Sequence, residues 1–151
     1  MNFALCLTLY GDGKKALEFY NRIFESTIVE LIEFADKRDI FGEMISKETE
    51  HYVYRAVLEL KGFSQMRIVI SDSPSILFCD DDTNKGNRDN IIIEINDLDD
   101  ITIHEIYNAL MEDGKSNKAP SKTDGQSLHG SLIDKFGICW NLYSKFTSTE
   151  A

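Results

Sequence analysis

The chain uses one seven-residue pattern twice. Residues Glu18–Phe24 read Glu-Phe-Tyr-Asn-Arg-Ile-Phe, and residues Glu105–Met111 read Glu-Ile-Tyr-Asn-Ala-Leu-Met. An apolar run precedes each copy, and strand-like runs follow it. Two copies are too few for a solenoid, in which each repeat stacks on its neighbours. The repeat therefore predicts two copies of one strand–helix–strands module.

The first module begins with an apolar run over residues 3–10, which predicts a buried strand. Gly11-Asp12-Gly13 ends that strand, and Asp12 is a candidate N-cap for a helix of about three turns with one apolar face. Residues 27–34 predict a second strand. Residues 35–50 are charged and lack clean periodicity, so we expect a mobile loop with a short helical turn, a candidate lid over a pocket.

A hairpin closes the first module, with strands at 54–60 and 66–71. If Leu60 lies opposite Met66, one face is uniformly apolar and packs under a helix. The other face is mixed and places Glu59 opposite Arg67 as an ion pair. It carries Arg55, Val57, Glu59 and Arg67. Such a face suits either a partly wet pocket wall or a solvent-facing sheet surface.

The second module follows a linker over residues 72–90. Residues 91–95 predict a buried strand, Thr102-x-x-Glu105 fits a capping box, and Gly114 is a natural helix stop. Residues 115–127 predict an edge strand or loop, and 128–133 with 137–143 a last hairpin. Alternation puts Ile92 and Glu94 on one face of their strand. In the last strand it puts Cys139, Asn141 and Tyr143 on the face opposite that of Ile138, Trp140 and Leu142.

Composition excludes several classes of function. With 16 basic and 26 acidic residues the net charge is −10, so a backbone-phosphate contact with nucleic acid is not expected. The three cysteines lack Cys-x-x-Cys spacing, which argues against a disulfide framework and a zinc knuckle.

No apolar run approaches membrane-spanning length and no signal peptide is evident, so we expect a cytoplasmic protein. Asp80-Asp81-Asp82 does not fit a calcium loop, because position twelve is Ile91.

Several ordered segments resemble the PhnB-like branch of the vicinal-oxygen-chelate superfamily, which includes glyoxalase I, extradiol dioxygenases, fosfomycin-resistance enzymes and bleomycin-binding proteins. The segments are Leu7-Thr-Leu-Tyr-Gly-Asp, Ala16-Leu-Glu-Phe-Tyr, Ile70-Ser-Asp-Ser, Glu112-Asp-Gly-Lys and Asp134-Lys-Phe-Gly-Ile-Cys-Trp-Asn. The resemblance covers nearly the whole chain apart from residues 35–50 and 78–88. It implies an α+β fold of two βαβββ modules, residues 1–77 and 88–146 of one domain, curled as an incomplete barrel around a cavity, commonly in a homodimer.

The resemblance also implies four places where the superfamily holds a divalent metal. In this sequence they are Leu5, Arg55, Asn90 and Asn141. Leucine does not ligate, arginine has no lone pair to give, and asparagine carbonyls are weak neutral ligands. We therefore expect no metal and no cofactor, and a surface or loop role for His51, His104 and His129. If these places face the cavity, alternation adds Ile92, Glu94, Cys139 and Tyr143 to the cavity side and sends Ile138, Trp140 and Leu142 into the helix-backed core. The predicted ligand-binding set is Leu5, Arg55, Val57, Glu59, Arg67, Asn90, Glu94, Asn141 and Tyr143.

Three functions remain open from the sequence. The first is a metal-independent protein that binds a small molecule in the cavity between the sheets. The second is an isomerase, lyase or dioxygenase that holds a metal in some other way. The third is a drug-sequestering protein, in which Glu59 and Glu94 contribute acidic charge. Relatives often carry the label of a demethylubiquinone methyltransferase, but the chain has no glycine-rich nucleotide loop to support it.

Overall fold

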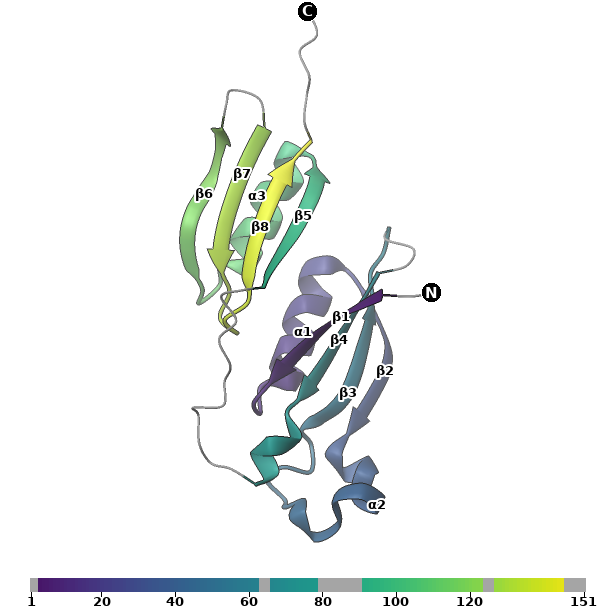
Figure 1. Ribbon diagram of the computed structural model, residues 1–151. Coiled ribbons are helices and arrows are strands. Elements are labelled where there is room, and N and C mark those ends of the chain that lie inside the picture. Colours follow the sequence, from purple (N-terminus) through teal and green to yellow (C-terminus); the bar gives the residue numbers. More distant parts are fainter. Residues whose placement is uncertain (1–2, 63–65, 79–90, 124–126, 146–151) are drawn as a thin grey trace, which may run out of the picture. The chain divides into compact units, whose positions relative to one another are not determined.

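The computed structural model describes residues 3–62, 66–78, 91–123 and 127–145 (Figure 1). The chain divides into two compact units, Met1–Gly86 and Asn87–Ala151, and each is described by itself. No helix in the described residues is long and apolar enough to cross a membrane.

The first unit is a four-stranded mixed sheet with one long helix on one face (Figure 1). The strand order is β1-β4-β3-β2, with β1 parallel to β4 and the other neighbours antiparallel. Its main elements are β1 (Phe3–Leu9), α1 (Gly13–Phe24), β2 (Thr27–Glu33), β3 (Val53–Glu59) and β4 (Met66–Asp72). A 3₁₀ turn, η3 (Pro74–Leu77), follows β4.

The second unit repeats this plan. Its strand order is β5-β8-β7-β6, again with the first strand parallel to the last. The elements are β5 (Ile92–Leu98), α3 (Asp100–Leu110), β6 (Lys115–Thr123), β7 (Ser127–Ile133) and β8 (Cys139–Ser144). The segment expected to be an edge strand or loop is therefore the edge strand β6. The predicted α+β fold of two βαβββ modules is confirmed.

The duplication extends to single hydrogen bonds. In the first unit the Ser73 amide donates to the Leu9 carbonyl at 2.7 Å, and in the second the Lys145 amide donates to the Leu98 carbonyl at 2.7 Å. Both bonds tie the end of the parallel strand pair. The shared Glu-x-Tyr-Asn pattern lies on both long helices. Its tyrosines, Tyr20 and Tyr107, are both buried, so the repeated pattern marks the core side of each helix.

The hairpin of the first unit has the predicted register. Leu58 pairs with Ile68, and Glu59 with Arg67. The apolar face is buried, with Ala56, Leu58, Ile68 and Ile70 at most 3% exposed. In the second unit Leu132, Trp140 and Leu142 fill the equivalent core. The predicted inward orientation of Trp140 and Leu142 is thus confirmed, because alternation fixes the face of a strand that has one solvated side.

Helix α1 begins at the expected place, but a different side chain accepts hydrogen bonds from the amides near its start. Asp12 occupies the N-cap position, but its side chain makes no capping hydrogen bond. Asp72, at the end of β4, accepts instead from the amides of Gly11 at 2.7 Å, Gly13 at 3.0 Å and Val53 at 2.9 Å. Burial raises the pKa of Asp72, against the opposing effect of these three amides. A remote carboxylate therefore satisfies the free amides near the start of the helix.

The capping box predicted at Thr102 is also corrected. Helix α3 begins one turn earlier, where Asp99 is the N-cap and accepts from the Thr102 amide at 2.7 Å. The Thr102 hydroxyl donates to the same carboxylate at 2.8 Å. These two hydrogen bonds lower the pKa of Asp99. An aspartate N-cap accepts from this amide without the reciprocal glutamate.

The motif that closes the second unit forms a turn built on Asp134, which is 3% exposed. One carboxylate oxygen accepts from the amides of Phe136 at 2.9 Å and Ile138 at 3.0 Å. The other accepts from Trp140 Nε1 at 2.9 Å. The spacing from aspartate to tryptophan therefore has a structural cause, since one side chain organises the turn and holds the indole.

Candidate functional site

The open face of the first sheet, opposite α1, carries four of the predicted site residues. Strand register places Arg55, Val57, Glu59 and Arg67 on this face. Its charges are paired with one another: Arg55 Nε donates to Glu30 Oε1 at 3.0 Å and Arg67 Nη2 to Glu59 Oε2 at 3.2 Å. Both pairs are about half exposed. The predicted ion pair Glu59–Arg67 is confirmed, and this face satisfies much of its own charge.

Leu5 lies on the opposite face from that set. It pairs with Ile68 in the β1–β4 ladder, and Ile68 belongs to the buried face under α1. Its neighbours Ala4 and Cys6 pair with Arg67 and Val69, on the open face. The placement of Leu5 beside Arg55 was therefore wrong, because a shift of one residue along a strand moves a side chain to the other face. Asn90 lies outside the described residues.

The open face of the second sheet carries the other three predicted residues. Glu94 pairs with Asn141, Asn141 pairs with Ser131, and Ser131 pairs with Lys118. Side by side across β5, β8, β7 and β6, they form a polar row with an acid at one end and a base at the other. The predicted common face of Glu94, Asn141 and Tyr143 is confirmed by this register.

An aromatic row lies next to the polar row. Tyr143 pairs with His129 across β8 and β7, and their rings stack with centroids 4.4 Å apart and planes 4° apart. Lys118 Nζ lies 3.5 Å from His129 Nδ1. His129 Nε2 is buried and has no hydrogen-bond partner among the described residues. On the other side of the polar row lie Ile92, Cys139 and Ile133.

His129 is the site residue that sequence reasoning missed. A surface or loop role was expected for all three histidines. His104 is exposed on α3 and His51 is exposed in a turn, but His129 is half-buried within strand β7. The signal was in the hairpin: once Ile133 is placed opposite Cys139, antiparallel pairing puts His129 opposite Tyr143.

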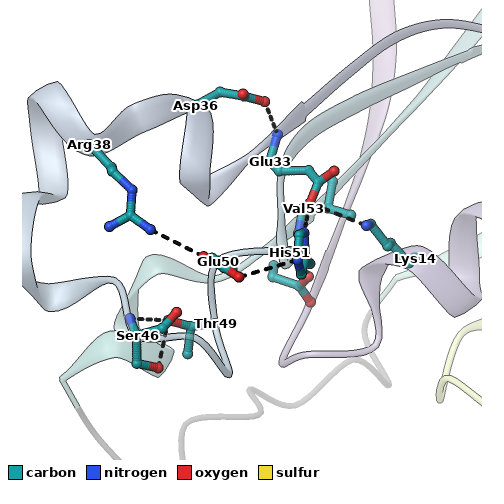
Figure 2. Close-up of polar contacts among 10 residues, drawn as sticks. Lys14, Glu33, Asp36, Arg38, Ser46, Thr49, Glu50, His51 and Val53 are labelled. Atoms are coloured by element: carbon teal, nitrogen blue, oxygen red, sulfur yellow. Dashed lines mark hydrogen bonds and ion pairs between the residues drawn. The ribbon is translucent and has the colours of Figure 1, made fainter.

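A second titratable cluster closes the segment between β2 and β3 (Figure 2). This segment holds η1 (Phe34–Lys37), α2 (Arg38–Phe41) and η2 (Gly42–Met44), so the expected helical turn is present. At its base His51 Nδ1 lies 2.8 Å from Glu33 Oε2 and His51 Nε2 lies 3.3 Å from Glu50 Oε1. The Nδ1 contact is a hydrogen bond, and the Nε2 contact is an ion pair when the imidazole carries two protons.

The outer ends of this cluster are basic. Lys14 lies 3.2 Å from Glu33, and Arg38 lies 3.3 Å from Glu50, so positive and negative groups alternate along the cluster. Burial raises the pKa of Glu33, but hydrogen bonds with His51 and Lys14 outweigh it, and the pKa lies below its ordinary value. The cluster ties α1, β2 and the returning end of the segment. The role of the segment between β2 and β3 as a lid over a pocket stays a prediction.

The residues at the superfamily's metal places do not fit a metal centre. Arg55 is committed to Glu30, Leu5 faces the core side, and Asn141 offers one neutral amide oxygen. Within residues 3–62, 66–78, 91–123 and 127–145, no group of three His, Cys, Asp or Glu side chains is placed to hold a metal ion.

Solved structures share the fold across nearly the whole chain. The protein PA1353 from Pseudomonas aeruginosa is 16% identical with a TM-score of 0.77, and covers 96% of this chain and 98% of its own. A putative 3-demethylubiquinone-9 3-methyltransferase, PhnB protein, from Bacillus cereus is 18% identical with a TM-score of 0.73, and covers 96% and 100%. The fosfomycin resistance protein FosX from Listeria monocytogenes is 12% identical with a TM-score of 0.61, and covers 99% and 94%.

Comparisons of the sequence with known families and proteins do not assign the chain to a family. No protein-family model matches the chain, and no curated protein matches it. At these identities the structural similarity establishes the fold. It is the fold of PhnB-like, fosfomycin-resistance and glyoxalase/bleomycin resistance/dioxygenase proteins, as the resemblance in the sequence implied.

Proposed function

We propose that this protein binds a small organic molecule on the open face of its second sheet. The observation that supports the proposal is the half-buried polar and aromatic set on β7 and β8, formed by His129, Ser131, Asn141 and Tyr143. Trp140 and Leu142 point the other way and fill the core. A few convergent polar groups beside apolar wall are the usual composition of a small-molecule site.

The two open faces differ in a way that favours the second. On the first sheet, Arg55 and Arg67 are each paired with a glutamate of the same face. On the second sheet, the base Lys118 and the acid Glu94 stand at opposite ends of the polar row, separated by two strands. At about 4.8 Å per strand, roughly 14 Å separates their backbones. Lys118 and Glu94 therefore do not neutralise each other, unlike the charged pairs of the first sheet.

Drug sequestration through Glu59 and Glu94 has weaker support. The Glu59 carboxylate accepts from Arg67, and the Glu94 carboxylate accepts from the Asn96 amide at 2.9 Å. A cationic drug would have to compete with both contacts. We therefore keep small-molecule binding without an assigned reaction as the proposed function. The homodimer implied by the resemblance stays a prediction, which the mass of the native protein tests.

A ligand screen by NMR tests the proposal. Binders from a mixture of small organic molecules should shift the amides of Ser131, Asn141 and Tyr143. Replacing Asn141 by leucine should weaken such binding about tenfold, since it removes one half-buried hydrogen-bonding group. Asn108→Leu is the matched control, because Asn108 is exposed on α3 of the same unit. Binding that shifts other surfaces, or that Asn108→Leu weakens equally, would contradict the proposal.

A further inference from the structure

Lys118 determines which nitrogen of His129 carries the ring proton. Its ammonium group lies 3.5 Å from His129 Nδ1. An ammonium group has three donors and no acceptor, so Nδ1 accepts in this contact and carries no proton. The proton of the ring is then on Nε2. This second nitrogen is a hydrogen-bond donor whose direction is fixed, because the imidazole stacks against Tyr143 at 4.4 Å.

The donor on Nε2 has no acceptor among the residues that the structure describes. The atom is buried, and no described residue accepts from it. A buried polar group without a partner costs free energy, and in native proteins such a group has a specific cause, such as a bound water, an ion or a catalytic role. In this tautomer Nε2 has no lone pair to offer a metal ion. The Nε2–H group instead needs an acceptor, which an oxygen atom with a lone pair supplies.

The charged group in contact with His129 is the Lys118 ammonium. Lys118 and Lys115 both lie on the open face of β6, opposite Ser131 and Ile133. The acid Glu94 stands at the far end of the polar row. Ser131 sits between Lys118 and Asn141 and adds a hydroxyl. A lysine, an imidazole N–H and a hydroxyl on neighbouring strands together favour an oxygen that carries negative charge.

We infer that the ligand of this face carries an anionic oxygen group, a carboxylate or a phosphate, which Lys118, His129 Nε2–H and Ser131 bind together. The inference rests on the proposed function and names the chemical class of its ligand. The body of the ligand lies toward Asn141 and the apolar row of Ile133 and Cys139. Tyr143 stacks on one face of the imidazole, and the Nε2–H bond lies in the plane of that ring.

Three probes test the inference on the full-length protein. Benzoate and inorganic phosphate supply the two anionic groups, and benzamide is a neutral molecule of nearly the same shape as benzoate. NMR of protein labelled with ¹⁵N-histidine should show a proton on His129 Nε2 before addition. Benzoate or phosphate should give a saturable shift of that signal and of Tyr143, and benzamide should bind at least about tenfold more weakly than benzoate.

Variants locate the binding on this face. Lys118→Met keeps most of the side-chain stem and removes the charge, and His129→Phe keeps a ring for stacking and removes the donor. Each should weaken binding of the preferred anion about tenfold or more. Lys122→Met is the matched control: Lys122 lies on the same strand but pairs with Leu128, on the other face. It should leave affinity unchanged within about twofold.

The outcomes separate this inference from the proposed function. Preference for benzoate or for phosphate decides between the two anionic groups, and either supports the inference. Neutral molecules that bind at Asn141 and Tyr143, without a saturable response to either anion, would overturn the inference and leave the proposed function standing. A Lys122→Met loss equal to that of Lys118→Met would also overturn it. If neither anions nor neutral molecules bind this face, both fail.

Discussion

Two buried aspartates, one in each unit, have the same structural role. Asp72 and Asp134 each accept three N–H donors from groups nearby in space and are at most 3% exposed. Each holds a turn that leads into or out of a strand. Because a carboxylate has only acceptors, its amide analogue presents NH₂ to at least one of the three donors. These positions therefore depend on aspartate more strongly than on side-chain size.

Replacing Asp134 by asparagine should lower the free energy of unfolding by about 2 kcal/mol. One asparagine oxygen can still accept from the Phe136 and Ile138 amides, but the NH₂ group then faces Trp140 Nε1. Denaturant unfolding measures the loss, and the emission of Trp140, the only tryptophan, reports the changed indole contact. Asp39→Asn, at an exposed residue of α2, is the control. Equal stability of both variants would contradict the assignment.

Where the structure places a residue differently from the sequence prediction, the difference has a physical reason. Asp12 was expected to cap α1, but the acceptor comes from Asp72, a contact between residues far apart in the chain. Leu5 was assigned to the wrong face because its strand is an unbroken apolar run with no alternation to mark two sides. Residues with clear alternation, such as Glu94 and Asn141, were placed correctly. The position of His129 depends on the register of the last hairpin, which places it opposite Tyr143.

At the scale of elements, the entry to α1 depends on close contact between strand and helix. A Cβ atom on Gly13 would lie 2.5 Å from Asp72 Oδ2 and 3.0 Å from Val53 Cβ. The glycine is needed for this approach of the backbone to a buried carboxylate. The repeated pattern predicted the helix, but only the packed unit shows why its first residue is glycine.

Gly13→Ala should therefore destabilise the protein by about 1–3 kcal/mol, the range for an extra methyl group in a packed interior. Alanine otherwise favours helix over glycine, so the sign of the change is itself diagnostic. Denaturant unfolding followed by far-ultraviolet circular dichroism gives the measurement. Lys15→Ala, at an exposed position on the same helix, is the control. A gain in stability for Gly13→Ala would show that the strand and helix do not approach so closely.

The segment between β2 and β3 is an element whose anchoring depends on pH. The pKa of Glu33 lies below its ordinary value in the folded protein. A carboxyl group with a depressed folded pKa contributes stability above its unfolded pKa, and that contribution is lost as the pH falls through the folded pKa. The glutamate remains partly exposed to solvent, at 26% for its side chain, so screening keeps the contribution small.

Glu33→Gln should thus be less stable than the unchanged protein at pH 5.5, by less than about 1 kcal/mol. The difference should shrink toward zero as the pH is lowered below the folded pKa, where the glutamate is itself protonated. Urea unfolding at a series of pH values from 5.5 to 3 measures it. Glu43→Gln, exposed on η2, should show no such pH-dependent difference. A gap that widens in acid would reverse the sign and reject the interpretation.

At the scale of the whole molecule, the two units share their architecture but differ in the side chains of their open faces. Both units keep the strand order and the same closing hydrogen bond. Their open faces have diverged: the first carries paired arginines and glutamates, and the second carries His129, Tyr143 and a row of neutral polar groups. The shared fold therefore leaves function to individual residues on these faces.

The same comparison predicts how the whole protein responds to metal removal. Among the described residues at the superfamily's ligand places, Leu5 and Arg55 have no lone pair to give and Asn141 is a weak neutral donor. Purified protein should hold far less than one divalent ion per chain by elemental analysis. A chelator should then leave the unfolding midpoint unchanged within about 1 °C, because an ion that binds only the folded state would raise it. Stoichiometric zinc, iron, manganese or nickel, with a midpoint that falls on chelation, would favour the metal-dependent alternative instead.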